Sequence, residues 1–173
     1  MSSQIDALDV RLLQLLEEHP RAGILEVSRL AGVARATVTS RIDRMQAAGV
    51  ITGYGPEIDL EAAGYPVQAL ATLEIAQGRL EDVQRLLASL PGVIEAYATT
   101  GTGDVHCRLA ATSNEDLQTL LLELNKSDAI RRSTSVVILS RLVAPRTLPL
   151  LQQHQRAAPS RAPGFRKHQA AGD

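Results

Sequence analysis

Residues 22–51 hold two short segments with the apolar spacing of helices, and a tight turn at Gly32 separates them. The second segment places Val38, Ile42 and Met45 on one stripe, and most of its other positions carry hydroxyl or guanidinium groups. A helix with one apolar stripe packs on its neighbours and leaves its polar side free for the major groove of DNA. This pattern predicts a helix-turn-helix and, through it, a DNA-binding protein.

The candidate DNA-contacting residues all lie on this second segment. Helix-turn-helix docking places the early part of the second helix against base edges, and arginine to guanine is the commonest specific contact. The residues expected to contact bases are Arg35, Thr37, Thr39 and Ser40. Arg41 and Arg44 lie further along, where they either hold phosphates or brace the domain. The alternative for the whole set is a solvated helix surface.

The composition restricts how such a protein can bind nucleic acid. The 173 residues carry a formal net charge of −1, so any contact with DNA must come from a local patch and not from a global positive field. Hydrophobic residues make up 45% of the chain and aromatic residues only 2%, so the core must consist of Leu, Val, Ile and Ala. The length suits one ordinary domain or two small ones.

Neither a membrane nor an oxidising compartment is indicated. Cys107 is the one cysteine, so the chain forms no internal disulfide, which suits a reducing cytoplasm. The first nine residues carry two acids and no long apolar run, so we expect no secretory signal. No run of about 18 apolar residues is present, so we expect a cytoplasmic protein without a membrane partner.

The residue pattern also argues against catalysis. His106 and Cys107 are neighbours on a predicted strand and therefore point to opposite faces, with Cys107 expected in the core. The chain shows no Ser-His-Asp or Cys-His arrangement and no phosphate-binding glycine loop with a lysine. We therefore expect no enzyme activity, no metal and no cofactor.

The first fifty residues predict three helices and a short strand. Asp6 caps a first helix, which ends before Pro20, and further helices follow over about residues 24–31 and 35–47. Residues 50–54 predict a short strand. The expected apolar stripe of the first helix consists of Leu8, Leu12 and Leu16, with Leu13 beside it.

The second half predicts an alternation of strands and helices. Strands are expected at about residues 67–75, 93–99, 105–111 and 133–143, and helices at about residues 80–90 and 114–124. The order βαββαβ is that of the ferredoxin-like fold. The predicted fold class is therefore α+β: an N-terminal winged-type helix-turn-helix domain joined to a C-terminal ferredoxin-like domain.

These elements imply four segments along the chain. Residues 1–53 form the helix-turn-helix domain, 54–66 a linker strand and connector, and 67–143 the ferredoxin-like domain. Residues 144–173 are rich in proline, alanine and arginine and are expected to form a largely disordered tail, although three leucines near residue 150 allow packing back. The tail is either solvated or in contact with DNA phosphates.

The last predicted strand indicates assembly. Residues 136–139 are consecutively apolar, so both faces of this strand carry hydrophobic side chains. We interpret this as a dimerisation surface, against the alternative of additional core within one subunit.

A second candidate site lies at the predicted turn of residues 101–104. Its glycines let backbone amides approach a carboxylate closely, and Asp104 offers an acceptor for an amino group. Nearby threonines supply hydroxyl groups. The candidate effector-binding residues are Thr100, Gly101, Thr102, Gly103, Asp104 and Thr134. The alternative is a tight hairpin turn that needs flexible residues for its geometry alone.

Several motifs together carry a family resemblance. In the first half they are Leu8–Leu13, Arg21, Val27–Val33, Val38, Arg41–Ile42, Arg44–Met45 and Gly49–Tyr54. In the second half they are Pro91–Val93, Gly101–Asp104 and Ser133–Val143. With these motifs the chain resembles the Lrp/AsnC, or feast/famine, regulators over about residues 5–143.

This resemblance implies a sequence-specific transcriptional regulator. It implies that residues 67–143 are the effector-sensing and oligomerisation domain, an amino-acid-sensing (RAM/ACT-like) domain. It implies a homodimer that assembles into tetramers or octamers on double-stranded DNA. It implies a small effector, usually an amino acid, bound between dimers near the Gly-x-x-Asp turn, and control of nearby amino-acid or nitrogen genes.

Three positions depart from the family pattern. Ala34 stands where the family usually has a capping serine, a change that costs about 1 kcal/mol. Ser40 replaces the first of two adjacent arginines, and Gly103 replaces an aromatic residue before the aspartate, which opens the effector site.

Two other functions remain to be weighed. Haem-pathway decarboxylases of the sirohaem type are similar in fold, and here His106, Arg108 and Arg132 are the candidates for lining a tetrapyrrole cavity. The other is an assembly module whose helices no longer bind DNA. A Soret band would indicate the first, and a gel shift separates the second from a regulator.

Overall fold

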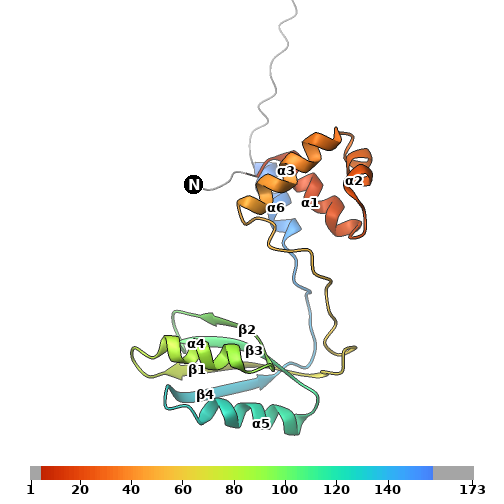
Figure 1. The fold of residues 1–173 in the computed structure, drawn as a ribbon. Helices are drawn as coiled ribbons and strands as arrows, with labels where there is room; N and C mark the ends of the chain where they lie inside the picture. The colour runs from red at the N-terminus through yellow and green to blue at the C-terminus, as the bar shows by residue number, and fades with distance from the viewer. Residues whose placement is uncertain (1–4, 158–173) are drawn as a thin grey trace, which may run out of the picture. The chain divides into compact units, whose positions relative to one another are not determined.

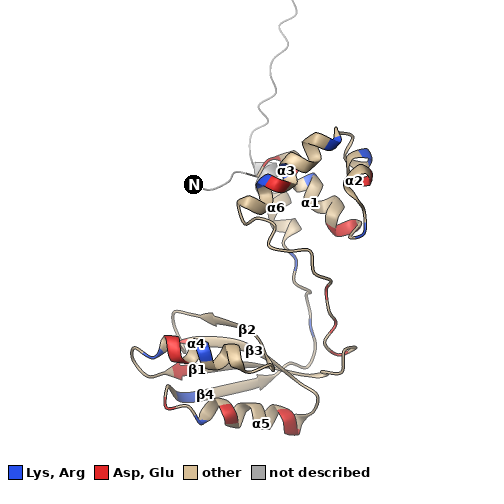
Figure 2. Ribbon diagram, viewed as in Figure 1, with Lys and Arg blue, Asp and Glu red and all other residues tan. Residues whose placement is uncertain are grey.

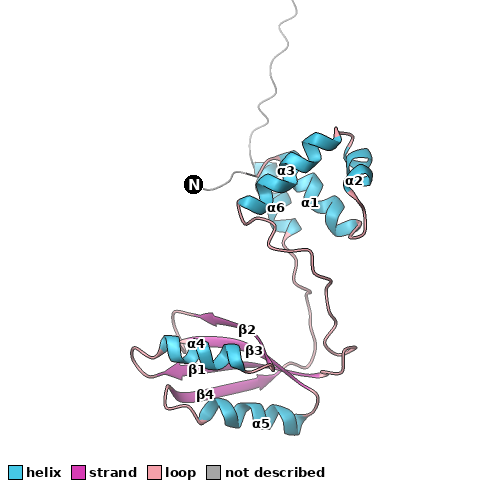
Figure 3. Ribbon diagram, in the orientation of Figure 1, coloured by secondary structure: helices cyan, strands magenta, loops and turns pink. Residues whose placement is uncertain are grey.

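The computed structural model of the chain describes residues 5–157 and divides into two compact units. One unit joins residues 5–54 to residues 144–157, and the other comprises residues 55–143 (Figure 1). The first unit is helical, whereas the second holds every strand of the described chain (Figure 3). The mixed α+β class and the helix-turn-helix plus four-stranded domain are confirmed.

The first helix, α1 (Ala7–Glu18), begins at a reciprocal cap. The Asp6 carboxylate accepts from the Asp9 N–H at 3.0 Å, and the Asp9 carboxylate accepts from the Asp6 N–H at 3.0 Å. The predicted cap at Asp6 is therefore confirmed. The N–H groups of Asp6 and Asp9, which have no partner within the helix, both find an acceptor. The helix ends at Glu18, and its C-cap His19 directly precedes Pro20.

The buried face of α1 differs from the predicted stripe. Its fully buried apolar residues are Val10, Leu12 and Leu15, whereas Leu8, Leu13 and Leu16 are only partly buried. The difference arises because α1 packs on α2, α3 and α6 together, so its apolar contact runs around more than one side.

Helices α2 (Ile24–Ala31) and α3 (Arg35–Ala47) form the helix-turn-helix. Gly32 adopts φ +69°, a left-handed conformation that ends α2 at little cost for glycine. Helix α3 starts three residues after Gly32, at Arg35, and its N-cap residue Ala34 supplies no side-chain cap. A short turn with glycine between two helices is the expected connection of this motif. Val27, Val38, Ile42 and Met45 close the small core with α1.

The predicted strand at residues 50–54 was wrong, and no wing strand is present in the described residues. The Val50 and Ile51 N–H groups donate to the Met45 carbonyl, at 2.8 and 3.3 Å. Both side chains pack against the core of the helical unit. Val50 and Ile51 therefore bond to the C-terminal end of α3 and pack on its core, and the segment pairs with no strand.

The second unit is a four-stranded antiparallel sheet with the order β2-β3-β1-β4. Its strands are β1 (Val67–Ile75), β2 (Val93–Ala98), β3 (Val105–Ala111) and β4 (Ile130–Val137). Its helices are α4 (Leu80–Ser89) and α5 (Asn114–Asn125), and the Ser113 hydroxyl caps α5 as an acceptor from Asp116 N–H. The predicted βαββαβ order is confirmed.

Both helices contribute to one core on one face of the sheet. Alternate residues of β1 and β3, from Ala69 to Leu73 and from Val105 to Leu109, meet Val83 and Leu87 of α4 and Leu117 and Leu124 of α5. The other residues of each strand lie on the opposite, open face. Two registered rows cross it: Tyr97, His106, Thr72 and Thr134, and beside them Glu95, Arg108, Leu70 and Val136.

Strand β4 ends six residues earlier than predicted, at Val137 instead of residue 143. Its partner β1 starts at Val67, directly after Pro66, and the last bond of the pair joins Ile138 N–H to the Gln68 carbonyl at 2.8 Å. Beyond this point β1 offers no further backbone groups, so the chain leaves the sheet and Leu139 is 97% exposed.

The segment after residue 143 also differs from the prediction of a disordered tail. Residues Leu148–Ala157 form a helix, α6, which packs against α1 and makes this segment part of the helical unit. Leu148 and Leu151, three residues apart, are partly buried, whereas Leu150 is exposed. The rest of the predicted tail, residues 158–173, lies outside the described residues.

Across residues 5–157, no helix is both long enough and apolar enough to cross a bilayer.

Candidate DNA interface and effector-binding turn

The polar side of α3 is open to solvent. Its apolar stripe is buried in the helical unit, and the four residues expected to contact bases are all exposed: Arg35, Thr37, Thr39 and Ser40. Ala36 and Asp43 are exposed as well. The start of α3 lacks a side-chain cap, so its first N–H groups are free to meet an acceptor such as a phosphate.

Arg41 and Arg44 are held differently. Arg41 Nη1 donates to the Asp6 carboxylate and, at 3.2 Å, to Asp9 Oδ1, and Arg44 Nη2 donates to Asp9 Oδ2. The Asp9 side chain has no exposed surface. The structure therefore joins the middle of α3 to the start of α1 through a buried carboxylate, which is the bracing role considered for these two arginines.

The pair of Asp6 and Arg41 stabilises the charged form of both groups. Burial alone would raise the pKa of Asp6, but hydrogen bonds from Arg41 and from the Asp9 N–H, together with the Arg41 charge, hold that pKa below its ordinary value. The hydrogen bonds to Asp6 and Asp9 likewise raise the pKa of Arg41. Both groups are therefore charged at neutral pH.

The turn between β2 and β3 is fixed mainly by backbone hydrogen bonds. Thr99 N–H donates to the Asp104 carbonyl at 2.9 Å, and Asp104 N–H donates to the Leu73 carbonyl at 2.8 Å. Asp104 Oδ2 accepts from Ile75 N–H at 2.7 Å, next to the bulge at Glu74 and Ile75 in β1. The Asp104 carboxylate thus anchors the turn to β1.

Gly103 fits this turn for two reasons. Its φ is +84°, and a Cβ built there would lie 2.2 Å from Cγ2 of Thr72. Thr72 Oγ1 is 3.1 Å from His106 Nδ1, and His106 Nε2 is 3.2 Å from the Thr102 carbonyl oxygen. The Thr102 carbonyl can only accept, so His106 Nε2 donates to it, while Nδ1 pairs with the Thr72 hydroxyl. Thr72 and His106 were not among the predicted effector-binding residues, because neither carries a local sequence signal for that site.

The structure brings five of the six predicted effector residues together on this exposed turn. Among the described residues, the N–H groups at positions 100–103 donate to no protein acceptor, so they are available to a carboxylate. Thr134 lies on β4, on the same row of the open face as His106 but two strands away, with Thr72 between them. It is therefore apart from the turn within one subunit.

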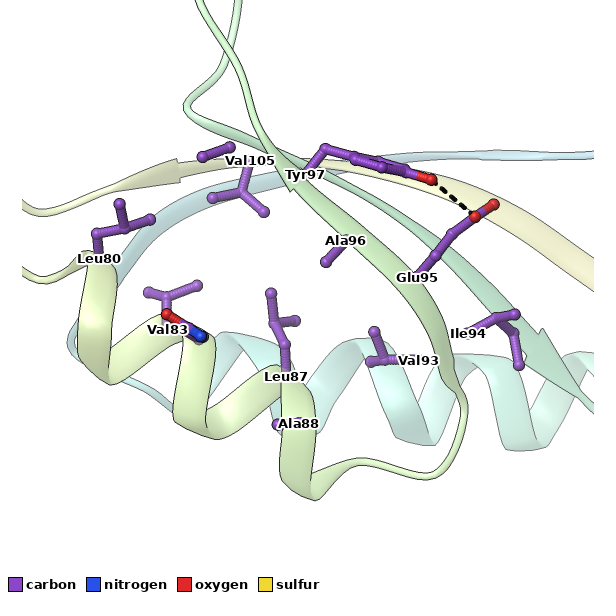
Figure 4. Close-up of a pocket in the computed structure, with 12 residues that line it drawn as sticks. Leu80, Val83, Leu87, Ala88, Val93, Ile94, Glu95, Ala96, Tyr97 and Val105 are labelled. Carbon is purple, nitrogen blue, oxygen red and sulfur yellow. Dashed lines mark hydrogen bonds between the residues drawn. The ribbon is translucent and has the colours of Figure 1, made fainter. Parts of the chain in front are cut away.

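A cavity of about 380 Å³ lies elsewhere, between α4 and β2 (Figure 4). Leu80, Val83 and Leu87 of α4 face Ala96 of β2 across it, and Val105 of β3 lines it near Leu80. None of the six predicted effector residues lines it. The small alanine side chains of the edge strand leave this space under the helix.

The remaining candidates occupy structural positions. Cys107 is buried in the core as expected, and burial raises the pKa of its thiol to about 11. His106 faces the opposite, open side, where Arg108 pairs with Glu95 at 3.2 Å. In the part of the chain that the structure describes, no three metal-binding side chains gather at one place.

Comparison with known proteins matches each half of the chain to a known domain family. An AsnC-type helix-turn-helix domain matches residues 5–46, and an Lrp/AsnC ligand binding domain matches residues 68–148. The chain is 30% identical over 142 residues to the HTH-type transcriptional regulator Rv2324 of Mycobacterium tuberculosis, covering 81% of this chain and 95% of that one. It is 26% identical over 150 residues to FL11 of Pyrococcus horikoshii, covering 87% and 99%.

Solved structures agree with this assignment. AsnC of E. coli has a TM-score of 0.78 at 26% identity, with 84% of this chain and 99% of that chain covered. The L-Met complex of the regulator NMB0573 from Neisseria meningitidis has a TM-score of 0.78 at 22% identity, with 87% and 99% covered, and supports the fold.

The fold and the two matched domains define an effector-responsive, DNA-binding transcriptional regulator of the helix-turn-helix type. The chain belongs to the Lrp/AsnC family.

Proposed function

We propose that the protein is a cytoplasmic homo-oligomer that binds specific duplex sequences through α3, and that a free amino acid adjusts this binding. The observation that carries the proposal is the arrangement of α3, whose apolar stripe is buried while Arg35, Thr37, Thr39 and Ser40 are exposed. A solvated helix surface would show the same exposure, so binding to DNA must be measured directly.

Footprinting on the region upstream of the protein's own gene tests the DNA-binding role. Wild type should protect a defined sequence at modest salt. Arg35→Ala should lower affinity for that sequence more than affinity for random duplex, because a base-edge contact carries discrimination of about 1–3 kcal/mol. An equal loss of affinity for both duplexes would show that Arg35 does not recognise bases. If wild type protects no sequence, the protein is instead an assembly module that does not bind DNA.

For the effector we propose the turn at Thr100, Gly101, Thr102, Gly103 and Asp104, completed by Thr134 of a neighbouring subunit. The available N–H groups of the turn suit the carboxylate of an amino acid, and the exposed Asp104 suits its amino group. The distance of Thr134 from the turn within one subunit supports a site shared between subunits.

Calorimetric titration of the amino acids, starting with L-Met because a structural neighbour was solved with it, tests this site. Asp104→Asn keeps an acceptor for Ile75 N–H but removes the charge, so it should weaken binding at least tenfold without loss of fold. The matched control is Asp128→Asn, at an exposed acid outside the turn. Equal affinity of the two variants would exclude Asp104.

The assembly proposal rests on the open face of the sheet. Leu70 and Val136 are registered neighbours on β1 and β4 and are 49% and 59% exposed. We propose that this face forms the dimer and that dimers combine into tetramers or octamers. Sedimentation of Leu70→Glu should show a smaller species than wild type, and an unchanged oligomer would place the interface elsewhere.

The enzyme alternative of the sirohaem decarboxylase type has its own test. Its three candidate residues, His106, Arg108 and Arg132, are engaged or spread over the open face, with His106 bonded within the protein and Arg108 paired to Glu95. Nothing in this arrangement favours it, and a Soret band in the purified protein would revive it.

A further inference from the structure

Two acids at the start of α1 and two arginines of α3 form one charged cluster, made of Asp6, Asp9, Arg41 and Arg44. Figure 2 shows that acidic and basic positions both occur among the helices of this unit. Asp6 is the N-cap of α1 and Asp9 lies in its first turn, and the carboxylate of each accepts from the backbone N–H of the other. The arginines lie one helical turn apart in the middle of α3. Asp9 contacts both arginines, so this single carboxylate links α1 to two successive turns of α3.

The cluster is built so that the acids are fixed and the arginines remain accessible. The Asp9 side chain is fully buried, whereas the side chains of Arg41 and Arg44 are 28% and 47% exposed. Each guanidinium uses one terminal nitrogen for the acids and keeps further N–H donors. A guanidinium held on one side by a buried carboxylate presents its other donors to solvent in a set direction.

The charges of the cluster cancel. Two acids balance two arginines, and across residues 5–54 six arginines stand against six acids, which gives a formal charge of zero. Arginines that are not paired with acids bind the phosphates of any duplex and release counterions, so affinity for DNA of any sequence rises with their number. Pairing Arg41 and Arg44 with acids therefore limits indiscriminate attraction to phosphates while keeping two donors at fixed positions.

We infer that Asp6 and Asp9 are positioning residues for sequence discrimination: they set the direction of Arg41 and Arg44 and keep these two arginines from acting as free phosphate contacts. The inference rests on the proposed use of α3 as the DNA-contacting helix. It assigns a role in recognition to two acids of α1 that do not themselves touch DNA.

The test compares wild type, Asp9→Asn and Asp9→Asn/Arg44→Gln on two probes, a duplex enriched from a random pool by wild type and the random pool itself. Asp9→Asn should raise affinity for the random pool about three- to tenfold and steepen its salt dependence by about one unit of slope, because a released arginine meets phosphate freely. The ratio of enriched to random affinity should fall about tenfold. The added Arg44→Gln should return the salt slope to that of wild type.

The matched control is Glu17→Gln, an exposed acid at the other end of α1 that changes the net charge equally. It should leave the ratio of enriched to random affinity unchanged. Circular dichroism and thermal unfolding establish that each variant is folded. If Asp9→Asn does not fold, Asp6→Asn replaces it, since Asp6 is 48% exposed and contacts only Arg41 among the two arginines. In Asp6→Asn the affinity for the random pool, its salt slope and the ratio of enriched to random affinity should then change in the same directions, but by smaller amounts.

The inference fails if the folded Asp9 or Asp6 variant keeps the wild-type ratio and salt slope and loses only thermal stability, since the cluster would then be a structural brace alone. It also fails if the control changes the ratio equally. Failure of the proposed function looks different, because wild type itself would then enrich no sequence from the pool.

Discussion

The two candidate sites of this regulator are held in place by different forces. Helix α3 is tied to α1 by side chains, through a buried carboxylate and two guanidinium groups far apart in sequence. The β2–β3 turn is tied to β1 by the bond from Asp104 N–H to the Leu73 carbonyl and by the bond from Ile75 N–H to the Asp104 carboxylate, and its two glycines adopt positive φ. We therefore expect the stability of the helical unit to depend most on charge, and the stability of the turn to depend most on backbone shape.

The largest effect is expected when the cations around Asp9 are removed. In Arg41→Gln/Arg44→Gln, Asp9 keeps a fully buried carboxylate without a cation, which costs about 3–5 kcal/mol of the free energy of unfolding. Hydrogen exchange of the α1 and α3 peptides should accelerate, and that of the sheet should not. The control is Arg79→Gln/Arg85→Gln on α4, whose partner Asp82 is more exposed and should tolerate the change.

A smaller effect is expected from one added methyl group on the effector side. Gly103→Ala combines positive φ with a clash against Thr72 Cγ2 and should cost about 1–3 kcal/mol in denaturant unfolding of the sheet unit. Gly101→Ala has positive φ but open space and should cost less. Thr72→Ser removes the clashing methyl group and keeps the hydroxyl for His106, so it should partly rescue Gly103→Ala. Equal costs at the two glycines would show that the clash is relieved elsewhere.

The smallest effect is expected from acid. Because the folded-state pKa of Asp6 is lowered, the stabilisation from its pair with Arg41 is fully present above the ordinary carboxyl pKa of about 3.9 and is lost as the pH falls through the lowered value. The difference in unfolding free energy between wild type and Asp6→Asn should therefore be constant near neutral pH and shrink in strong acid. A difference that does not depend on pH would contradict the ion pair.

Local patterns were sufficient for much of the fold. The helix caps at Asp6 and Ser113, the glycine turn at Gly32 and the order of helices and strands along the chain follow from capping, φ preferences and alternation, and all are present. The prediction of a strand at residues 50–54 was wrong because the N–H groups of Val50 and Ile51 donate to the end of α3 and not to a neighbouring strand. Helix α6 was missed because its stability comes from packing on α1, far away in sequence.

The candidate sites were less predictable than the fold. The exposure of Arg35 and its neighbours follows from helical spacing alone. The link from Asp9 to Arg41 and Arg44 spans more than thirty residues and depends on how α1 crosses α3, which no local pattern contains. The sequence offered one signal for Asp9: an acid three residues after the Asp6 cap has the spacing of a capping box, which predicts that its carboxylate lies at the start of α1. Likewise, only the strand register brings Thr72 beside Gly103 and His106.

Sequence recognition by α3 is tested most directly by selecting duplexes from a random pool with the intact protein and then measuring affinity at physiological salt. We predict an enriched sequence with two related half-sites about one helical turn of DNA, or a multiple, apart. We also predict binding to that sequence at least about 10³-fold tighter than to the random pool. A pool that stays random after repeated rounds, or equal affinity for selected and random duplexes, would contradict sequence recognition by α3.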